Sequence, residues 1–170
     1  MKLSVGLRPA GDKDTEFLYR LYASTRAEEM ALVDWTEDQV EQFLRMQFQA
    51  QHTYYHEQFK QAAFDVIEQN DIAIGRLYVD RREQEIRIID IALLPEYRGW
   101  GIGGAIMQAL IDEAVGSNRS VSIHVEHNNP AMHLYQRLGF RHVSDEGVYF
   151  FMKWEPPDAP QARDQENTAS

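Results

Sequence analysis

Three glycines and one arginine fall within the six residues Arg98-Gly99-Trp100-Gly101-Ile102-Gly103. A glycine-rich turn that leads into a helix can aim consecutive backbone N–H groups at one point, because glycine tolerates positive φ and the first N–H groups of a helix lack partners. The positive end of the helix dipole favours negative charge at the same place. This stretch therefore predicts a binding site for a phosphate or pyrophosphate.

The segments on either side of this turn are typical of a strand and a helix. Residues 85–94 begin with alternating character and become almost wholly apolar, which predicts a central strand buried on both faces and ended by Pro95. Residues 100–115 predict a helix, and residues 121–125 predict a further strand, so the turn would lie in a β-α-β unit. The expected inward face of the helix comprises Ile102, Ile106, Ala109, Leu110 and Ala114.

The rest of the chain predicts strands and helices on both sides of this unit. Asp12 would cap a first helix, and the capping box from Thr36 to Gln39 would open a second one. Asn129 would cap the last helix, and Gly139 would end it. The expected order is β-α-α-β-β-β-α-β-α-β-β. The other strands are expected over residues 5–9, 64–68, 72–79, 141–143 and 148–154, and a loop or broken helix over 24–35.

Gly99, Gly101 and Gly104 also match the glycine spacing of a dinucleotide-binding turn. A nicotinamide-binding fold would place an Asp or Glu at a second strand end about twenty residues further on. The stretch 117–120 offers Ser, Asn, Arg and Ser instead. A Walker-type P-loop is excluded, because no Gly-Lys-Ser/Thr follows the turn. The missing acidic residue weakens the nicotinamide alternative.

A second motif begins at Asn128, 30 residues after Arg98. It reads Asn128-Asn129-Pro130-Ala131, then Leu134-Tyr135, then Gly139-Phe140. Together with the strand and glycine turn before it, this pattern resembles the GNAT superfamily of acyl-CoA-dependent N-acyltransferases. The motifs that carry the resemblance lie between residues 85 and 140. The expected order of elements matches the family over most of the chain, and this match is weakest over 24–64. It implies an α/β (α+β) fold with a mixed, mostly antiparallel sheet of about seven strands, helices on both faces and splayed central strands.

By this resemblance, the anion site would hold the pyrophosphate of acetyl-CoA. Asn128 would hydrogen-bond the pantetheine arm or fix the exit of the strand before it. Tyr135 would reach the sulfur and protonate the departing thiolate, since a phenol keeps its proton at pH 7, although a core tyrosine is the alternative. The pyrophosphate would bind the backbone amides of Arg98, Gly99, Trp100, Gly101, Ile102, Gly103 and Gly104, and the pantetheine arm would pair with Ile91, Ala92 and Leu93.

An acceptor ammonium must lose a proton before it attacks a thioester, so a base or a water chain is required. Some family members use a glutamate five residues before the motif asparagine, but Ile123 stands there in this chain. Asp90 lies in an otherwise apolar strand, where a carboxylate is costly unless paired, and a pair with Arg76 is the structural alternative. His124 has a suitable ordinary pKa. The candidates are Glu85, Asp90, His124 and Glu126.

Acceptor specificity is expected within residues 24–55. Glu28, Glu29, Asp34 and Trp35 would form an acidic mouth with an aromatic edge, suited to a cationic amine. A solvated loop is the structural alternative. The predicted acceptor-binding residues are Glu28, Glu29 and Trp35.

Composition narrows the partners and the compartment. We expect one N-acetyltransferase domain over residues 1–155 and a disordered tail over 156–170. A net charge of −10 argues against nucleic acid or a membrane surface as a partner. The chain has no cysteine, signal-like N-terminus or long apolar run, which fits the cytoplasm. His52, His56 and His127 show no metal-binding pattern. A homodimer is allowed, since many relatives pair.

The expected function is direct transfer of an acetyl group from acetyl-CoA to the primary amine of a small molecule or peptide, in a ternary complex. Direct transfer is favoured because the chain has no cysteine and no evident Ser-His-Asp set to form an acyl-enzyme. The first alternative is an acyl-CoA-binding or regulatory module of the same fold that lacks turnover. The second is a nicotinamide-dependent oxidoreductase.

Overall fold

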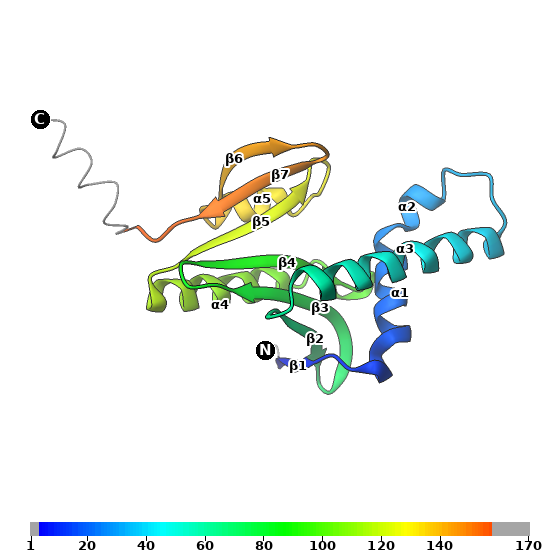
Figure 1. Cartoon of the computed structure of the whole chain (residues 1–170), viewed down its shortest axis with the longest axis horizontal. Coiled ribbons are helices and arrows are strands. Elements are labelled where there is room, and N and C mark those ends of the chain that lie inside the picture. The colour runs from blue at the N-terminus through cyan, green and yellow to red at the C-terminus, as the bar shows by residue number, and fades with distance from the viewer. Residues whose placement is uncertain (1–3, 158–170) are drawn as a thin grey trace, which may run out of the picture. The chain divides into compact units, whose positions relative to one another are not determined.

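The computed structural model describes residues 4–157, in which seven strands form one sheet (Figure 1). The strand order is β1-β2-β3-β4-β5-β7-β6. The strands β4 and β5 run parallel, whereas the pairs β1–β2, β2–β3, β5–β7 and β6–β7 run antiparallel. The strands are β1 (Val5–Pro9), β2 (Ala63–Gln69), β3 (Ile72–Arg81), β4 (Glu85–Leu93), β5 (Ser120–Glu126), β6 (Arg141–Glu146) and β7 (Tyr149–Trp154).

The helices complete the expected order of elements, and the short helix α2 lies within residues 24–35, where a loop or broken helix is predicted. Two short 3-10 turns, Asp12–Asp14 and Pro95–Tyr97, precede α1 and α4. The mixed, mostly antiparallel sheet is thereby confirmed. Residues 158–170 of the predicted tail lie outside the described residues. The helices are α1 (Thr15–Thr25), α2 (Ala27–Met30), α3 (Glu37–Gln58), α4 (Ile102–Ser117) and α5 (Met132–Arg137).

Two of the predicted helix ends are confirmed in their hydrogen bonds. The Gln39 N–H donates to Thr36 Oγ1 at 3.2 Å, and the Thr36 N–H donates to Gln39 Oε1 at 2.9 Å, which is the reciprocal capping box at the start of α3. Gly139 ends α5 with a φ of +101°, and the Phe140 N–H donates to the Tyr135 carbonyl at 3.0 Å. This is the bond pattern of a glycine-terminated helix.

Two predicted N-caps are wrong. Asp12 lies in a 3-10 turn, and it is the Asp14 carboxylate that accepts the Gly11 N–H, at 2.9 Å, where the chain enters α1. Asn129 accepts the Ala131 N–H at 2.9 Å, so its side chain closes a turn and α5 begins only at Met132. In both places a side chain of the expected type bonds a turn that precedes the helix.

The start and the buried face of α4 also differ from the prediction. The helix begins at Ile102 rather than at residue 100, because Trp100 lies between two glycines whose positive φ is not helical. Ala109 is exposed, whereas Met107 and Ile111 are buried. The buried stripe is therefore rotated by a fraction of a turn from the predicted one.

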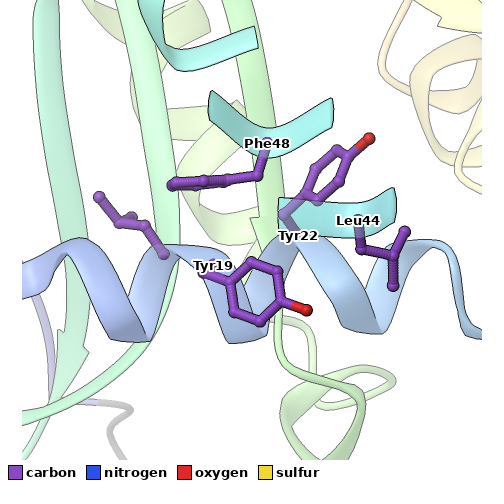
Figure 2. Close-up of a cluster of buried hydrophobic side chains, with 5 residues drawn as sticks. Tyr19, Tyr22, Leu44 and Phe48 are labelled. Carbon is purple, nitrogen blue, oxygen red and sulfur yellow. The ribbon is translucent and has the colours of Figure 1, made fainter. Parts of the chain in front are cut away.

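The described residues divide into two compact units, the first comprising 4–80 and 90–103 and the second 81–89 and 104–157. In the first unit α1 and α3 pack through aromatic side chains. Tyr19 and Tyr22 each place their ring 6.0 Å from the Phe48 ring, and Figure 2 shows these rings gathered with Leu44 between the two helices. This cluster fixes the helices that border the predicted acceptor region.

The second unit is built around apolar side chains of its strands and α4. Ile86, Ile88, Val121 and Ile123, which alternate along β4 and β5, are almost fully buried. A Cβ on Gly104 would lie 3.6 Å from Leu134, so α4 and α5 approach closely at that point. The expected burial of β4 on both faces is only partly met, since Ile89 to Leu93 are half-buried.

Asp14 and Arg8 form a two-fold ion pair with N–O distances of 2.7 and 2.9 Å, and this bond holds the pKa of the nearly buried carboxyl at about 2, below its ordinary 3.8. A lowered acid pKa stabilises the fold above the ordinary value and loses that effect as pH falls toward 2. We expect Asp14→Asn to lower the free energy of unfolding by about 2 kcal/mol at pH 7 and by little near pH 2. Urea unfolding at both pH values measures this.

Asp12→Asn, in the same turn, is the matched control. Asp12 accepts the Thr15 hydroxyl through its backbone carbonyl, and this bond survives the change of its side chain to an amide. A pH-independent loss in Asp14→Asn would contradict the ion-pair explanation.

Candidate active site

The glycine turn follows β4, leads into α4 and contains two glycines with positive φ. Gly99 has a φ of +80° and Gly101 a φ of +83°, with the exposed Trp100 between them. A side chain at either glycine would strain the backbone. The predicted positive-φ turn is therefore confirmed, and it ends at Ile102, where the first N–H groups of α4 begin.

Gly103, the second residue of α4, is not required to be a glycine by its contacts in the described chain. Its φ is not in the positive range, and no described atom lies within 4 Å of the place that a Cβ would occupy. A glycine inside a helix costs about 1 kcal/mol relative to alanine. A glycine in the first turn of α4 leaves the backbone there open to the close approach of a ligand. In this respect the turn fits a phosphate-bearing molecule.

Arg98 is exposed, and its side chain turns back toward the strand that precedes it. Its Nε–H donates to the Leu93 carbonyl at 3.0 Å. The bond ties the glycine turn to the last residue of β4. The guanidinium thus keeps its positive charge at the turn, where it would add to the attraction for an anion.

The pairing of the two parallel strands covers only the first part of β4. Pairing of β4 with β5 runs from Glu85 opposite Ser120 to Ile88 opposite Ile123 and ends there, although both strands continue. The remaining part of β4 contains Ile91 to Leu93, the residues expected to pair with a pantetheine arm. In the first unit, a Cβ on Gly75 would collide with the Ala92 carbonyl oxygen, so β3 approaches this segment closely.

Tyr135 lies on α5 in the second unit and is almost fully buried, with its ring 5.8 Å from the Phe140 ring. Asn128 is exposed in the turn that follows β5. Gly104 also belongs to the second unit, whereas Arg98 to Gly103 belong to the first. The roles of these residues toward a cofactor stay predictions.

His124 is held from two sides within the second unit. Its Nδ1 contacts Arg87 Nη2, and its Nε2 lies 3.1 Å from Glu146 Oε2. A guanidinium has donors only, so Nδ1 must be the lone-pair nitrogen, and Nε2 carries the proton that it donates to Glu146. The histidine is thereby fixed as the neutral Nε2–H tautomer.

The surroundings of His124 favour its neutral form. Burial and then the positive charge of Arg87 lower its pKa below the ordinary value, against the opposing effect of Glu146. A neutral imidazole can accept a proton, whereas an imidazolium cannot. In its neutral form His124 therefore has the chemistry that a general base requires.

Asp90 forms the predicted pair with Arg76 in the first unit, at 2.5 Å between Asp90 Oδ2 and Arg76. Arg76 is buried, bonds Gln51 Oε1 at 2.9 Å, and lies over the Tyr78 ring. Burial lowers the pKa of Arg76, but the charge and hydrogen bond of Asp90, together with Tyr78 and Tyr55, outweigh this and leave the pKa above its ordinary value. The pair therefore joins α3, β3 and β4, and this structural role accounts for the carboxylate without a catalytic one.

Glu85 is the first residue of β4, in the second unit. Its carboxylate accepts the Ser122 hydroxyl and lies 3.6 Å from Arg82. It is thus engaged at the end of the strand opposite to the glycine turn. A catalytic role for Glu85 stays an untested prediction with less support than the one for His124.

Of the three predicted acceptor residues, Trp35 lines a groove in the first unit, whereas Glu28 and Glu29 do not. Glu28 is exposed on α2, and Glu29 bonds Arg26 at 3.1 Å. Trp35 is half-exposed, packs edge-on against Phe43 at 5.2 Å, and lines an open groove of about 620 Å³. The groove is also lined by residues that the sequence did not single out, namely Glu16, Tyr19, Arg20, Met30, Ala31, Glu37, Val40, Glu41, Leu44 and Arg45.

No three His, Cys, Asp or Glu side chains within residues 4–157 form a group that could hold a metal ion. Within the same residues, no helix has both the length and the apolar character needed to cross a bilayer.

Residues 20–140 match the family model described as "Acetyltransferase (GNAT) family". The N-alpha-acetyltransferase of Sulfurisphaera tokodaii is 36% identical over 59 residues, covering 33% of this chain and 35% of that protein. The Cysteine-rich protein 2-binding protein of Homo sapiens is 33% identical over 92 residues, covering 54% of this chain but only 11% of its own length.

A crystal structure of PaiA N-acetyltransferase from Thermoplasma acidophilum, in complex with coenzyme A, shares the fold. Its TM-score is 0.66 at 17% identity, covering 90% of this chain and 99% of that one. Because the family model spans 20–140 of the 170 residues, this protein belongs to the GNAT family of acetyltransferases.

Proposed function

We propose that the protein transfers an acetyl group from acetyl-CoA directly to a primary amine, within a ternary complex. The observation that carries the proposal is the glycine turn, with two positive-φ glycines followed by Gly103, where the missing side chain leaves the backbone open to a ligand. Relatives described as N-acetyltransferases, one of them in complex with coenzyme A, support the same donor.

The residues proposed to hold acetyl-CoA divide by chemistry. Backbone amides from Arg98 to Gly104 bind the pyrophosphate, and the backbone of Ile91 to Leu93 pairs with the pantetheine arm. Asn128 adds a side-chain hydrogen bond. When bound, acetyl-CoA supplies the thioester that the amine attacks.

Three groups of the chain would carry the proton and charge movements. His124 accepts a proton from the acceptor ammonium at Nδ1, which has a lone pair in the neutral tautomer, once Arg87 has moved away from that nitrogen. A backbone N–H of β4 stabilises the oxyanion that forms at the thioester carbon. Tyr135 then donates its phenolic proton to the departing thiolate.

Gly103→Ala separates folding from cofactor binding. We expect the variant without ligand to be more stable than wild type, by up to about 1 kcal/mol, because alanine is the better helix residue and the site has room for it. We also expect weaker binding of acetyl-CoA, because the added methyl keeps the pyrophosphate from the backbone. Melting curves with and without acetyl-CoA measure both effects.

Gly116→Ala is the matched control, since Gly116 lies in the last turn of the same helix and no described atom lies within 4 Å of the place that its Cβ would occupy. It should gain stability and keep the full thermal shift with acetyl-CoA. If acetyl-CoA raised the melting temperature of both variants equally, Gly103 would not be part of the cofactor site.

A further inference from the structure

His124 has no nitrogen available for a proton as the structure stands, and this limits which acceptors the protein can use. Its Nε2–H is engaged with Glu146, and its Nδ1 accepts from Arg87. A base whose lone pair is held by a guanidinium cannot take a proton until that guanidinium moves.

Of the two partners of His124, Arg87 is the one that must move, because it occupies the nitrogen Nδ1 that would take the proton. The Glu146 oxygen that faces His124, Oε2, also accepts the Ser144 hydroxyl at 3.3 Å, and Ser144 lies on the same β6 strand. Arg87 comes from β4 and lies over the Phe151 ring, with its guanidinium carbon 5.6 Å from the ring centroid. The centroid of the His124 ring lies 5.0 Å from the same Phe151 centroid, so Arg87 and His124 both contact the Phe151 ring.

The register explains why these side chains share a face. Arg87 pairs with Ser122 across β4 and β5, and His124 pairs with Phe151 across β5 and β7. Side chains two residues apart on a strand point to the same side, so Arg87, His124 and Phe151 do as well. The groups that face His124 from the strands around it are Arg87, Glu146, Tyr149 and Phe151.

Building on the proposed function, on which this step rests, we propose that the acceptor is a primary amine with a carboxylate a few bonds away, and that Arg87 recognises this carboxylate. A guanidinium binds a carboxylate through two parallel N–H bonds, which a ring nitrogen cannot match. The carboxylate thereby draws Arg87 off Nδ1, and the amine of the same molecule takes its place. The short reach between Arg87 and Nδ1 requires that the amine and the carboxylate be close in the acceptor.

The proton step balances without a further reactant. An N–H bond of the acceptor ammonium breaks and an Nδ1–H bond forms on His124, which becomes a cation that donates from both nitrogens. The Glu146 carboxylate stabilises that cation through the existing Nε2–H bond. The neutral amine keeps the electron pair with which it attacks the thioester, and His124 later returns its proton to water.

The first test uses the wild-type protein and matched acceptors. Release of the coenzyme A thiol is followed with β-alanine against β-alaninamide, and with a tripeptide beginning in aspartate against the same tripeptide beginning in asparagine. Rates are compared at equal concentrations of neutral amine, because the carboxylate changes the pKa of the amine. We expect kcat/KM to be about 10- to 100-fold higher for the carboxylate member. The two pairs distinguish a free amino acid from an acidic peptide N-terminus as the source of the carboxylate.

Two variants and a control test the residue. In Arg87→Gln the preference for the carboxylate member of each pair should vanish, mainly because the KM for that member rises. The rate of transfer to the amide member should rise, because no guanidinium contacts Nδ1 of His124 in this variant. Arg87→Lys should keep part of the preference, as it keeps the charge without the two-pronged geometry. Arg141→Gln removes an equal charge from an exposed position on β6 and should keep the full preference.

The outcomes for the two proposals differ. Transfer to neither member of any pair, with acetyl-CoA binding intact, would contradict the proposed function. Transfer to both members at equal kcat/KM would overturn the role of Arg87 and leave the acetyltransferase intact. The wild-type comparison decides this even where a variant fails to fold.

Discussion

Gly101→Glu should raise the dissociation constant of acetyl-CoA by at least about 100-fold, because like charges placed together cost several kcal/mol. The carboxylate would project into the turn that is proposed to hold the negatively charged pyrophosphate. Its bulk acts in the same direction, since no described atom lies within 4 Å of the Gly101 Cβ position and the space is open to a ligand. Isothermal titration of acetyl-CoA into both proteins measures the change.

Strain must be separated from charge in this experiment, because Gly101 has a φ of +83°. Gly147→Glu is the matched control, since Gly147 has a φ of +68° and also has no described atom near its Cβ position. It lies in the turn between β6 and β7. Both variants should lose similar stability, but only Gly101→Glu should lose acetyl-CoA binding. If Gly101→Glu still bound acetyl-CoA tightly, the pyrophosphate would have to bind at a place other than this turn.

Tyr135→Phe should lower kcat by about 100- to 10,000-fold, the usual range for loss of a general acid. The change removes one hydroxyl and keeps the ring that packs near Phe140. Affinity for acetyl-CoA should change little, because the proposed bond to sulfur matters most when negative charge develops on it. Steady-state kinetics and calorimetry on the same preparation separate the two effects.

Tyr54→Phe on α3, where the tyrosine is 55% exposed, is the control for loss of a hydroxyl. It should retain wild-type kcat. If Tyr135→Phe turned over at the wild-type rate, Tyr135 would be a buried core residue and the acid would have to be sought elsewhere.

The features predicted from the sequence are those that depend on neighbours in the chain. The capping box at Thr36, the glycine end of α5 and the turn at Gly99 and Gly101 each follow from a residue type whose backbone preference acts locally. The Asp12 and Asn129 caps are wrong because a polar side chain can close either a turn or a helix, and sequence does not distinguish the two. The Ala109 error has a similar origin, since an amphipathic stripe can rotate by one residue.

The site beyond the glycine turn depends on strand pairing, which sequence patterns do not fix. Arg87 and His124 are 37 residues apart, and His124 and Glu146 are 22 apart. Their contact follows from the register of three strand pairs, and a shift of one residue would send the side chains to the other face. The available signal is an arginine within an apolar central strand, which demands a polar neighbour as Asp90 does.

The most direct test of the proposed acetyl transfer is detection of the acetylated amine. Protein, acetyl-CoA and a panel of primary amines with and without a nearby carboxylate are incubated together, and products are identified by mass spectrometry, with Gly101→Glu in parallel. We predict an N-acetylated product and an equal amount of free coenzyme A with wild type, and neither with the variant. Tight acetyl-CoA binding without any acetylated amine would contradict acetyl transfer and indicate a binding module of the same fold.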